Sequence, residues 1–417
     1  MLLVGVLREV IKRGELTMID AHGKRHCIGD RARGPAVTIR LHDPRLHWKL
    51  LLNPRLYAGE AYMDGTLTVE DATIYDFLDL MGLNTGGGTV GGWDRRLARA
   101  QKLWRWFQQY NPLGRAQANV AHHYDLSAEL YEIFLDSDRQ YSCAYFVTPE
   151  STLEAAQAAK KIHIAAKLAL KPGMRVLDIG SGWGGMALYL ARTAGVDVTG
   201  ITLSTEQLRL SQQRAAAEGL EDQVRFIRCD YREMAGTFDR IVSVGMFEHV
   251  GVPHYRTFFR KMRELLTDDG IALLHTISDR NCPSAGNPWL HKYIFPGGYC
   301  PSLSEILPYT EEIGLWVTDI EILRLHYAET LRHWRDRFVA NWDKAASLYD
   351  ERFCRMWEFY LAGCEVAFRR QGQMVAQIQL TKSVDALPIT RDYMTEWERG
   401  HGPAHGDVEP RRLKSVR

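Results

Sequence analysis

Two ionisable side chains, Glu248 and His249, directly follow FDRIVSV, a run of residues typical of a buried strand. Burying an ionised carboxylate costs several kcal/mol unless another group pairs with it. This pair therefore either reaches solvent where the strand ends or lies in a site that uses charge. For His249, a structural role and a role in orienting a neighbouring group are equally favoured.

A glycine-rich segment, VLDIGSGWGG, follows another predicted strand and opens a helix. Gly180 and Gly182 permit a tight turn and a close approach of the backbone to a ligand. The spacing differs from the G-x-G-x-x-G of dinucleotide-binding folds, and D-x-G-x-G is similar to the first motif of the S-adenosylmethionine-dependent methyltransferases. The alternative is an ordinary strand-to-helix turn. We expect cofactor contacts at Asp178, Gly180, Gly182, Trp183 and Gly184.

The next strand departs from the usual methyltransferase pattern. Many such enzymes end it with Asp or Glu, which binds the ribose hydroxyls, whereas this strand ends GITLSTEQ and has Asp197 only at its start. Neutral side chains would then have to supply the hydrogen bonds. We expect this role for Thr202, Ser204 and Gln207.

The third strand is followed by CDYREM. Asp230 is a candidate to bind the adenine amino group, and Tyr231 is a candidate to stack on the base. Arg232 completes the expected cofactor residues of this loop. Capping of the following segment by Asp230 is an equally favoured alternative.

The elements that must position these residues alternate between residues 174 and 276. Apolar strand-like runs and helical runs follow one another, which predicts a mostly parallel, doubly wound α/β sheet of the Rossmann-like class I methyltransferase type. Ligands of such sheets bind beyond the carboxyl ends of the strands. Asp178, Glu248 and His275 all fall at or near such ends, and this placement favours a functional role for Glu248.

Changes in composition divide the chain into four parts. Short strand-like and helical pieces predict a smaller α+β domain at the start, and the glycine-rich stretch NTGGGTVGG fits a flexible boundary after it. The expected parts are an amino-terminal lipid-binding or accessory domain (1–84), a linker with a basic aromatic helix (85–110), a catalytic domain (111–395) and a disordered tail (396–417).

The basic aromatic helix RRLARAQKLWRWF interleaves Arg, Lys and Trp. Basic side chains near anionic lipid contribute about 1 kcal/mol each, and Trp suits the membrane interface. We therefore expect Arg95, Arg96 and Arg99 to contact a membrane surface. Docking between domains through salt bridges is an equally favoured alternative.

The composition is that of a folded protein, and its formal net charge of +1 indicates no charged partner, nucleic acid included. The seven cysteines are scattered without zinc spacing, so we expect reduced thiols in a cytoplasmic protein and no metal. The apolar run at the start is too short for a secretory signal. No apolar stretch approaches the ~20 residues of a membrane span. Membrane contact should therefore be peripheral, at the inner face of the cytoplasmic membrane.

Several segments occur in an order that closely resembles the cyclopropane-fatty-acyl-phospholipid synthases and the mycolic acid cyclopropane synthases. The resemblance runs from about residue 110 to 380. The first ~85 residues resemble the amino-terminal domain of the bacterial phospholipid enzymes, most clearly at GEAYMDG, and this domain favours phospholipid substrates. The segments are HHYDLS, YSCAYF, DIGSGWG, TLSTEQ, FDRIVSVGMFEHVG, HTI, YIFPGGYCPS and FYLAGCEVAFR.

This resemblance implies a reaction in which the alkene of an unsaturated phospholipid acyl chain attacks the sulfonium methyl of S-adenosylmethionine. A proton then leaves the transferred carbon as the ring closes, and the implied base is a bound bicarbonate ion. An anion beside Glu248 is repulsive unless a proton is shared, so we expect the pair to titrate together. The implied contacts of the ion are the side chains of Glu248, His275 and Tyr360 and the backbone of Cys143 and Ile277.

Other residues of the matched segments have implied roles. Cys364 in YLAGC occupies a position proposed as catalytic in the family, but the reaction needs no thiolate and simple packing is favoured. Tyr141 and Ser142 in YSCAYF are expected to contact the cofactor. Lid or cofactor contacts are expected from His122, His123 and Tyr124.

Three functions stay open at this point. The first is cyclopropane synthesis on unsaturated phospholipid acyl chains, which the glycine-rich loop and the implied bicarbonate residues favour. The second is an S-adenosylmethionine-dependent methyltransferase that makes methylene or methyl branches, because only the proton that is lost differs. The third is a non-catalytic lipid-binding scaffold. A homodimer through residues 1–84 is an assembly that the sequence allows without showing it.

Overall fold

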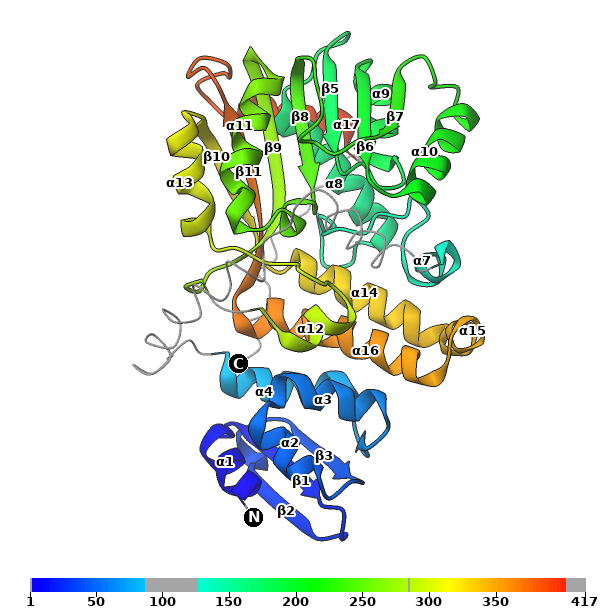
Figure 1. Ribbon diagram of the computed structural model, residues 1–417, viewed down its shortest axis with the longest axis vertical. Helices are drawn as coiled ribbons and strands as arrows, with labels where there is room; N and C mark the ends of the chain where they lie inside the picture. Colours follow the sequence, from blue (N-terminus) through cyan, green and yellow to red (C-terminus); the bar gives the residue numbers. More distant parts are fainter. Residues whose placement is uncertain (1, 87–126, 284–285, 403–417) are drawn as a thin grey trace.

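The computed structural model describes residues 2–86, 127–283 and 286–402. These residues form a four-stranded sheet near the N-terminus and a seven-stranded sheet at the opposite end of the molecule (Figure 1). The expected basic aromatic helix lies outside the described residues, so its membrane role stays a prediction. The same holds for Arg95, Arg96, Arg99, His122, His123 and Tyr124.

The smaller sheet has the strand order β2-β1-β3-β4, with β1 parallel to β3 and antiparallel to β2. Leu16, Met18 and Ile39 are buried on it together with Leu80 of α4, in an apolar core that continues to Trp289 and Trp357 of the catalytic part. The predicted α+β character is therefore confirmed. Its elements are α1 (Leu2–Val10), β1 (Gly14–Ile19), β2 (Arg25–Asp30), η1 (Arg31–Arg33), β3 (Ala36–Leu41), α2 (Leu46–Leu52), α3 (Pro54–Met63), β4 (Leu67–Val69) and α4 (Ile74–Thr85).

The larger sheet has the strand order β10-β11-β9-β8-β5-β6-β7. Its pairs are parallel except for the two that β11 makes with β9 and β10. The order reverses between β5 and β8, and such a reversal opens a crevice at the carboxyl ends of the strands. The predicted doubly wound α/β class is confirmed. The strands are β5 (Arg175–Ile179), β6 (Asp197–Thr202), β7 (Val224–Arg228), β8 (Phe238–Val244), β9 (Leu266–Asp279), β10 (Trp316–Leu323) and β11 (Gln373–Thr381).

Helices cover both faces of the larger sheet. Val176 and Val242 pack with α8, α9 and α10, whereas Leu177 and Ile241 pack with α11 and α13, because successive strand side chains point to opposite faces. None of the helices in the described ranges is long and apolar enough to span a bilayer. The helices are α7 (Ala128–Phe134), α8 (Leu153–Leu168), α9 (Gly185–Ala194), α10 (Thr205–Ala217), α11 (Tyr255–Leu265), α12 (Pro288–Tyr293), α13 (Leu303–Ile313), α14 (His326–Ala340), α15 (Trp342–Leu348) and α16 (Glu351–Val366).

The two sheets are joined through helices. α3 and α4 lie against α12 and α16, which in turn pack below the larger sheet (Figure 1). The contact at Gly59 is tight, since a Cβ there would lie 2.4 Å from Nε1 of the buried Trp289. Acidic residues of α3, α4 and the turn after α3 pair with basic residues across this contact: Glu60 with Lys292, Asp64 with Arg352 and Asp79 with Arg370.

The structure corrects the expected start of the tail. A last helix, α17 (Asp392–His401), follows β11 and packs on α8. Met394 is buried, and Glu398 lies 2.5 Å from Nδ1 of His163. Residues 396–401 are therefore helical and held by tertiary contacts, and the rest of the expected tail, 403–417, lies outside the described residues.

Candidate functional site

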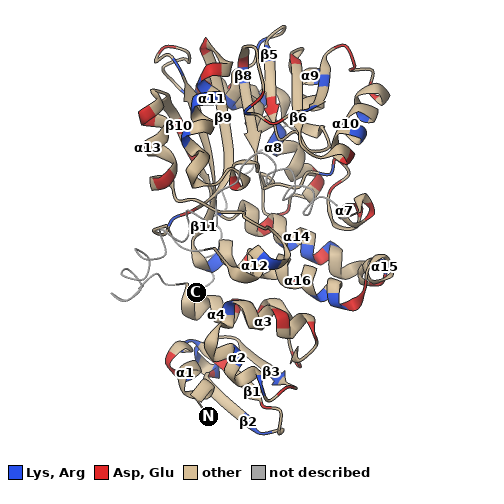
Figure 2. Ribbon diagram, viewed as in Figure 1, with Lys and Arg blue, Asp and Glu red and all other residues tan. Residues whose placement is uncertain are grey.

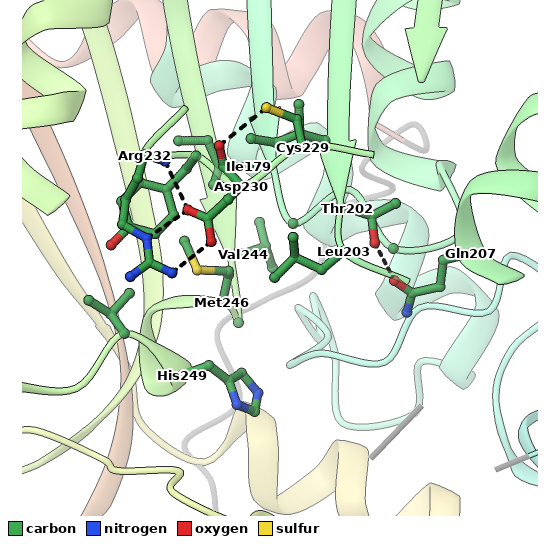
Figure 3. Close-up of a pocket in the computed structure, with 16 residues that line it drawn as sticks. Ile179, Thr202, Leu203, Gln207, Cys229, Asp230, Arg232, Val244, Met246 and His249 are labelled. Carbon is green, nitrogen blue, oxygen red and sulfur yellow. Dashed lines mark hydrogen bonds and ion pairs between the residues drawn. The ribbon is translucent and has the colours of Figure 1, made fainter. Parts of the chain in front are cut away.

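A pocket opens beyond the carboxyl ends of β5, β6, β7 and β8, where the strand order reverses (Figure 3). Seven of the expected cofactor residues line it, namely Gly180, Gly182, Thr202, Gln207, Asp230, Tyr231 and Arg232. His249 lines it as well, so the residue after Glu248 does face a site. Apolar residues that no motif indicated complete the wall, among them Leu203, Cys229, Val244, Met246 and Val250.

The glycine-rich loop has the backbone that its sequence requires. Gly180, Gly182 and Gly184 all have positive φ, at 85°, 55° and 86°. The N–H groups of Gly180 and Ser181 both donate to the carbonyl of Ile201, 2.9 Å away, and tie the loop to β6. Gly184 serves packing, since a Cβ there would lie 2.7 Å from the ring of Phe226. The expected contact residue Trp183 is also buried, against Tyr131.

The residues after β6 bind one another. The Thr202 hydroxyl donates to the amide oxygen of Gln207 at 2.8 Å, and Ser204 caps α10 by accepting from the Gln207 N–H. These three expected residues are brought together, with Thr202 and Gln207 in the pocket wall and Ser204 behind it. A ligand with hydroxyl groups would meet neutral donors and acceptors here.

Asp230 is held by its neighbour Arg232. The guanidinium donates to both carboxylate oxygens at 2.8 and 2.7 Å, and the Arg232 N–H donates to Oδ1 at 3.0 Å (Figure 3). Asp230 therefore organises its own turn, as the capping alternative expected, and also presents a carboxylate to the pocket. The ring of Tyr231 is buried and packs edge-on against Phe258.

Two buried ionisable residues, Asp178 and Lys160, lie next to the glycine-rich loop. The sequence indicated only Asp178. Asp178 is buried, its Oδ2 has no hydrogen-bond partner in the described residues, and burial raises its pKa to about 7, with Lys160 opposing the rise. Lys160 of α8 donates to the side chains of Gln140 and Ser142 at 2.6 and 2.8 Å, and burial lowers its pKa to about 8. A carboxylate oxygen without a partner suits an ammonium or hydroxyl donor of a ligand, so this corner fits a bound cofactor. The Ala-rich run AAQAAKKIHIAAKL holds three lysines, and the sequence alone does not single out Lys160 among them.

Glu248 lies in the short helix η2 (Phe247–His249) just beyond β8. Its Oε1 accepts a hydrogen bond of 2.5 Å from the N–H of Ile277, which engages the backbone group expected to hold the anion. Its Oε2 is buried without a partner among the described residues. Burial raises the pKa of Glu248, and hydrogen bonds from the backbone of Ile277 and Glu248 and from the Thr276 side chain only partly offset this. The carboxyl group is thus prepared to keep or share a proton.

His275 lies on β9, one strand away from β8. Burial lowers its pKa to about 3, so the imidazole is neutral. Its Nδ1 lies 3.1 Å from the side-chain nitrogen of Gln377 on β11. The pKa of His249 is likewise lowered by burial, to about 4.

Two tyrosines are candidates for the hydroxyl group that is expected to contact the anion. The hydroxyl of Tyr360 is 2.7 Å from that of Tyr141, so these two expected residues bind each other. Tyr327, which sequence reasoning missed, lies in the first turn of α14. Burial, followed by the electrostatic influence of Cys143, Cys364 and Glu248, raises its pKa well above the ordinary value. Tyr327 is therefore the phenol within electrostatic reach of both Glu248 and Cys143.

The cysteines of the site are protonated thiols. Cys143 is fully buried and its Sγ donates to the Ala144 carbonyl. Burial raises the pKa of Cys143, and it raises the pKa of Cys364 to about 12. Both values disfavour a thiolate nucleophile, which supports the packing interpretation of Cys364. The described residues contain no cluster of His, Cys, Asp and Glu that could hold a metal ion.

Known proteins are similar to this chain in sequence. The family model "Mycolic acid cyclopropane synthetase" matches residues 112–378. "Cyclopropane-fatty-acyl-phospholipid synthase" of Escherichia coli (strain K12) is 39% identical over 350 residues, which cover 83% of this chain and 88% of that protein. "Probable fatty acid methyltransferase" of Pseudomonas putida is 36% identical over 383 residues, which cover 88% of this chain and 93% of that protein.

Solved structures of cyclopropane synthases have a similar fold. The cyclopropane synthase MmaA2 from Mycobacterium tuberculosis superposes with a TM-score of 0.61 at 32% identity, over 65% of this chain and 98% of that one. Mycolic acid cyclopropane synthase CmaA1 complexed with SAH and CTAB has a TM-score of 0.60 at 36% identity, over 65% of this chain and 99% of that one. The chain therefore belongs to the mycolic acid cyclopropane synthetase family of S-adenosylmethionine-dependent enzymes.

Proposed function

We propose that this protein is a cyclopropane-fatty-acyl-phospholipid synthase. It transfers a methylene group from S-adenosylmethionine to the cis double bond of unsaturated phospholipid acyl chains, with bound bicarbonate as the general base. The observation that carries the proposal is Glu248. It combines a raised pKa with a buried, unpartnered Oε2, beside a cofactor pocket of the methyltransferase type.

The site residues fit an anion that shares a proton. A carboxylate at full charge would repel bicarbonate, but a carboxyl group with a raised pKa can hold the proton between the two. Neutral His275 and the Tyr327 hydroxyl add hydrogen-bonding groups without net charge. S-adenosylmethionine, when bound, supplies an electrophilic methyl group. The protein's part is to hold a weak base close to that methyl group and to keep water out.

Aromatic rings support the same chemistry. Tyr141 stacks on Trp334 with ring centroids 5.1 Å apart, and Tyr360 packs edge-on against Trp357 and Phe295. Packed rings of this kind exclude water around the expected residues Tyr141 and Tyr360.

A branching methyltransferase is the second candidate. It is favoured by the 36% identity, over 88% of this chain, to the protein of Pseudomonas putida named as a probable fatty acid methyltransferase. Both reactions begin with methyl transfer to an alkene, and the position of the base decides which proton leaves. Glu248 and its unpartnered oxygen support a base in either reaction, and the 39% identity to the cyclopropane-fatty-acyl-phospholipid synthase of Escherichia coli favours ring closure.

The amino-terminal unit supports peripheral contact with a membrane. On α1 and the adjacent α2, the side chains of Leu2, Val6, Trp48 and Leu52 are 67%, 50%, 62% and 81% exposed. Residues 1–58 contain 11 Lys and Arg against 5 Asp and Glu, and Lys and Arg occur on α2, β2 and β3 (Figure 2). The acidic residues Glu60, Asp64 and Asp79 instead pair with the catalytic domain. Exposed Leu and Trp within a basic surface suit anionic lipid.

Product analysis tests the proposed reaction. The protein is incubated with vesicles of unsaturated phospholipid and S-adenosylmethionine that carries a trideuterated methyl group, and the released fatty acids are analysed by gas chromatography and mass spectrometry. A ring retains two deuteriums, whereas a methyl-branched alkene, which forms when the acyl chain loses the proton instead, retains three. A methylene branch also retains two, so proton NMR of the unlabelled product separates ring from alkene. A branched product would replace the proposal with the second candidate, and unlabelled lipid would contradict both.

A further inference from the structure

A buried chain of two polar side chains, Lys167 and Gln377, leads to His275. Gln377 and His275 are register partners on the antiparallel strands β11 and β9, and they are 1% and 2% exposed. The Gln377 side-chain nitrogen lies 3.1 Å from Nδ1 of His275. At its other end, the Gln377 oxygen accepts from Nζ of Lys167 on α8 at 2.7 Å. The second ring nitrogen of His275 has no hydrogen-bond partner in the described residues.

The direction of this chain follows from its first member. Burial lowers the pKa of Lys167, and its hydrogen bond to the Glu321 carboxylate opposes this and favours the ammonium, which can only donate. The Gln377 oxygen must therefore face Lys167, because the flipped amide would set an NH₂ group against an ammonium. The amide nitrogen then faces Nδ1 of His275 and can only donate to it. A neutral imidazole that accepts at Nδ1 carries its proton on Nε2.

We infer that Gln377, oriented by Lys167, is a positioning residue that holds His275 in the Nε2–H tautomer and so makes it a hydrogen-bond donor to the anion of the site. The part played by the anion rests on the proposed function, whereas the tautomer does not. A buried glutamine costs free energy unless its hydrogen bonds are made, and an apolar residue would complete the sheet as well. Fixing the tautomer of His275 would explain why a glutamine occupies this buried position.

A matched pair of variants tests the inference. Gln377→Glu keeps the size of the side chain, but its carboxylate can only accept, and so draws the proton of His275 to Nδ1. Gln379→Glu places the same carboxylate two residues along β11, where the native side chain is equally buried and donates to the Lys167 carbonyl and the Tyr393 hydroxyl. In protein labelled with ¹⁵N-histidine, ring nitrogen–proton correlation NMR reports the tautomer, and His275→Asn identifies the signal.

We expect the Nε2–H form in the wild type and in Gln379→Glu, and the Nδ1–H form in Gln377→Glu. Turnover of Gln377→Glu should fall about 10- to 100-fold with little change in KM for phospholipid vesicles. If loss of S-adenosylmethionine binding shows that Gln377→Glu does not fold, Gln377→Met is used, which should give mixed tautomers and a similar loss.

An Nδ1–H signal in the wild type would overturn the inference, as would a pure Nε2–H signal or wild-type turnover in the Gln377 variants. The spectra are recorded on the resting protein. If the wild type makes no cyclopropane product, the proposed function fails, but the NMR spectrum still tests the tautomer of His275. If it makes the product with His275 protonated on Nδ1, the inference fails and the function stands.

Discussion

At the scale of single residues, Glu248 is the group on which the proposed chemistry depends. In Glu248→Gln the amide oxygen still accepts from the Ile277 N–H, so the local fold is kept, but the side chain can no longer share a proton with an anion. We expect turnover to fall by about 10²- to 10⁴-fold while S-adenosylmethionine binding, measured by calorimetry, is unchanged. Normal turnover would remove Glu248 from the base site.

A second prediction at this scale distinguishes Tyr327 from Tyr360. The pKa of Tyr327 is raised by burial and then by the electrostatic influence of Cys143, Cys364 and Glu248, whereas the hydroxyl of Tyr360 is engaged with Tyr141. Tyr327→Phe should therefore reduce turnover more than Tyr360→Phe does, and the difference should be about tenfold or more. The reason is that Tyr327→Phe removes a hydrogen-bond donor within electrostatic reach of Glu248. Steady-state rates of the two matched variants decide the point, and the reverse order would restore the role expected for Tyr360.

At the scale of elements, the docking of α17 should depend on pH. His163 is stacked on Tyr145 and lies between Glu321 and Glu398; burial would lower its pKa, but hydrogen bonds to the two carboxylates raise it. A raised pKa stabilises the fold fully below the unfolded value of 6.5, and the stabilisation disappears as pH rises through the folded value. Lys167 opposes the shift without reversing it.

Glu398→Gln should therefore lower the free energy of unfolding by about 1 to 2 kcal/mol near pH 6 and by progressively less toward pH 9. Denaturant titrations across this range measure the difference. Glu396→Gln is the control, since Glu396 is exposed on the same helix. An equal loss at every pH would show that the charge of His163 contributes nothing to the docking.

The contact between the helices α3 and α12 gives a second prediction at this scale. A methyl group at Gly59 would overlap Trp289, a rigid and buried ring, so Gly59→Ala should destabilise the protein by about 1 to 3 kcal/mol. Gly5→Ala on α1 is the control, because nothing lies within 4 Å of its added Cβ and Ala favours a helix. Chemical denaturation compares them, and an unchanged Gly59→Ala protein would mean that the two units are not held by this contact.

At the scale of the whole molecule, the exposed apolar side chains of the amino-terminal unit predict which surface of the protein binds a membrane. Replacing both Trp48 and Leu52 with Ser should weaken binding to anionic phospholipid vesicles by at least about tenfold, because both side chains leave water on the membrane. Trp316→Ser is the control, since Trp316 is 53% exposed on β10 at the other end of the molecule. Co-sedimentation measures both, and equal losses would contradict a specific lipid-facing surface.

The sequence by itself determined the fold class, the cofactor loop and the place of Glu248. These features depend on local pattern: strand and helix periodicity, glycines at a fixed spacing after a strand, and a carboxyl group just beyond a strand end. Candidate residues on other elements escaped it, as Lys160, Tyr327 and Gln377 did. Which tyrosine hydroxyl is engaged with Tyr141, and that a glutamine 102 positions from His275 meets its Nδ1, depend on strand register and helix packing. Those contacts join distant segments, so only the tertiary structure decided them.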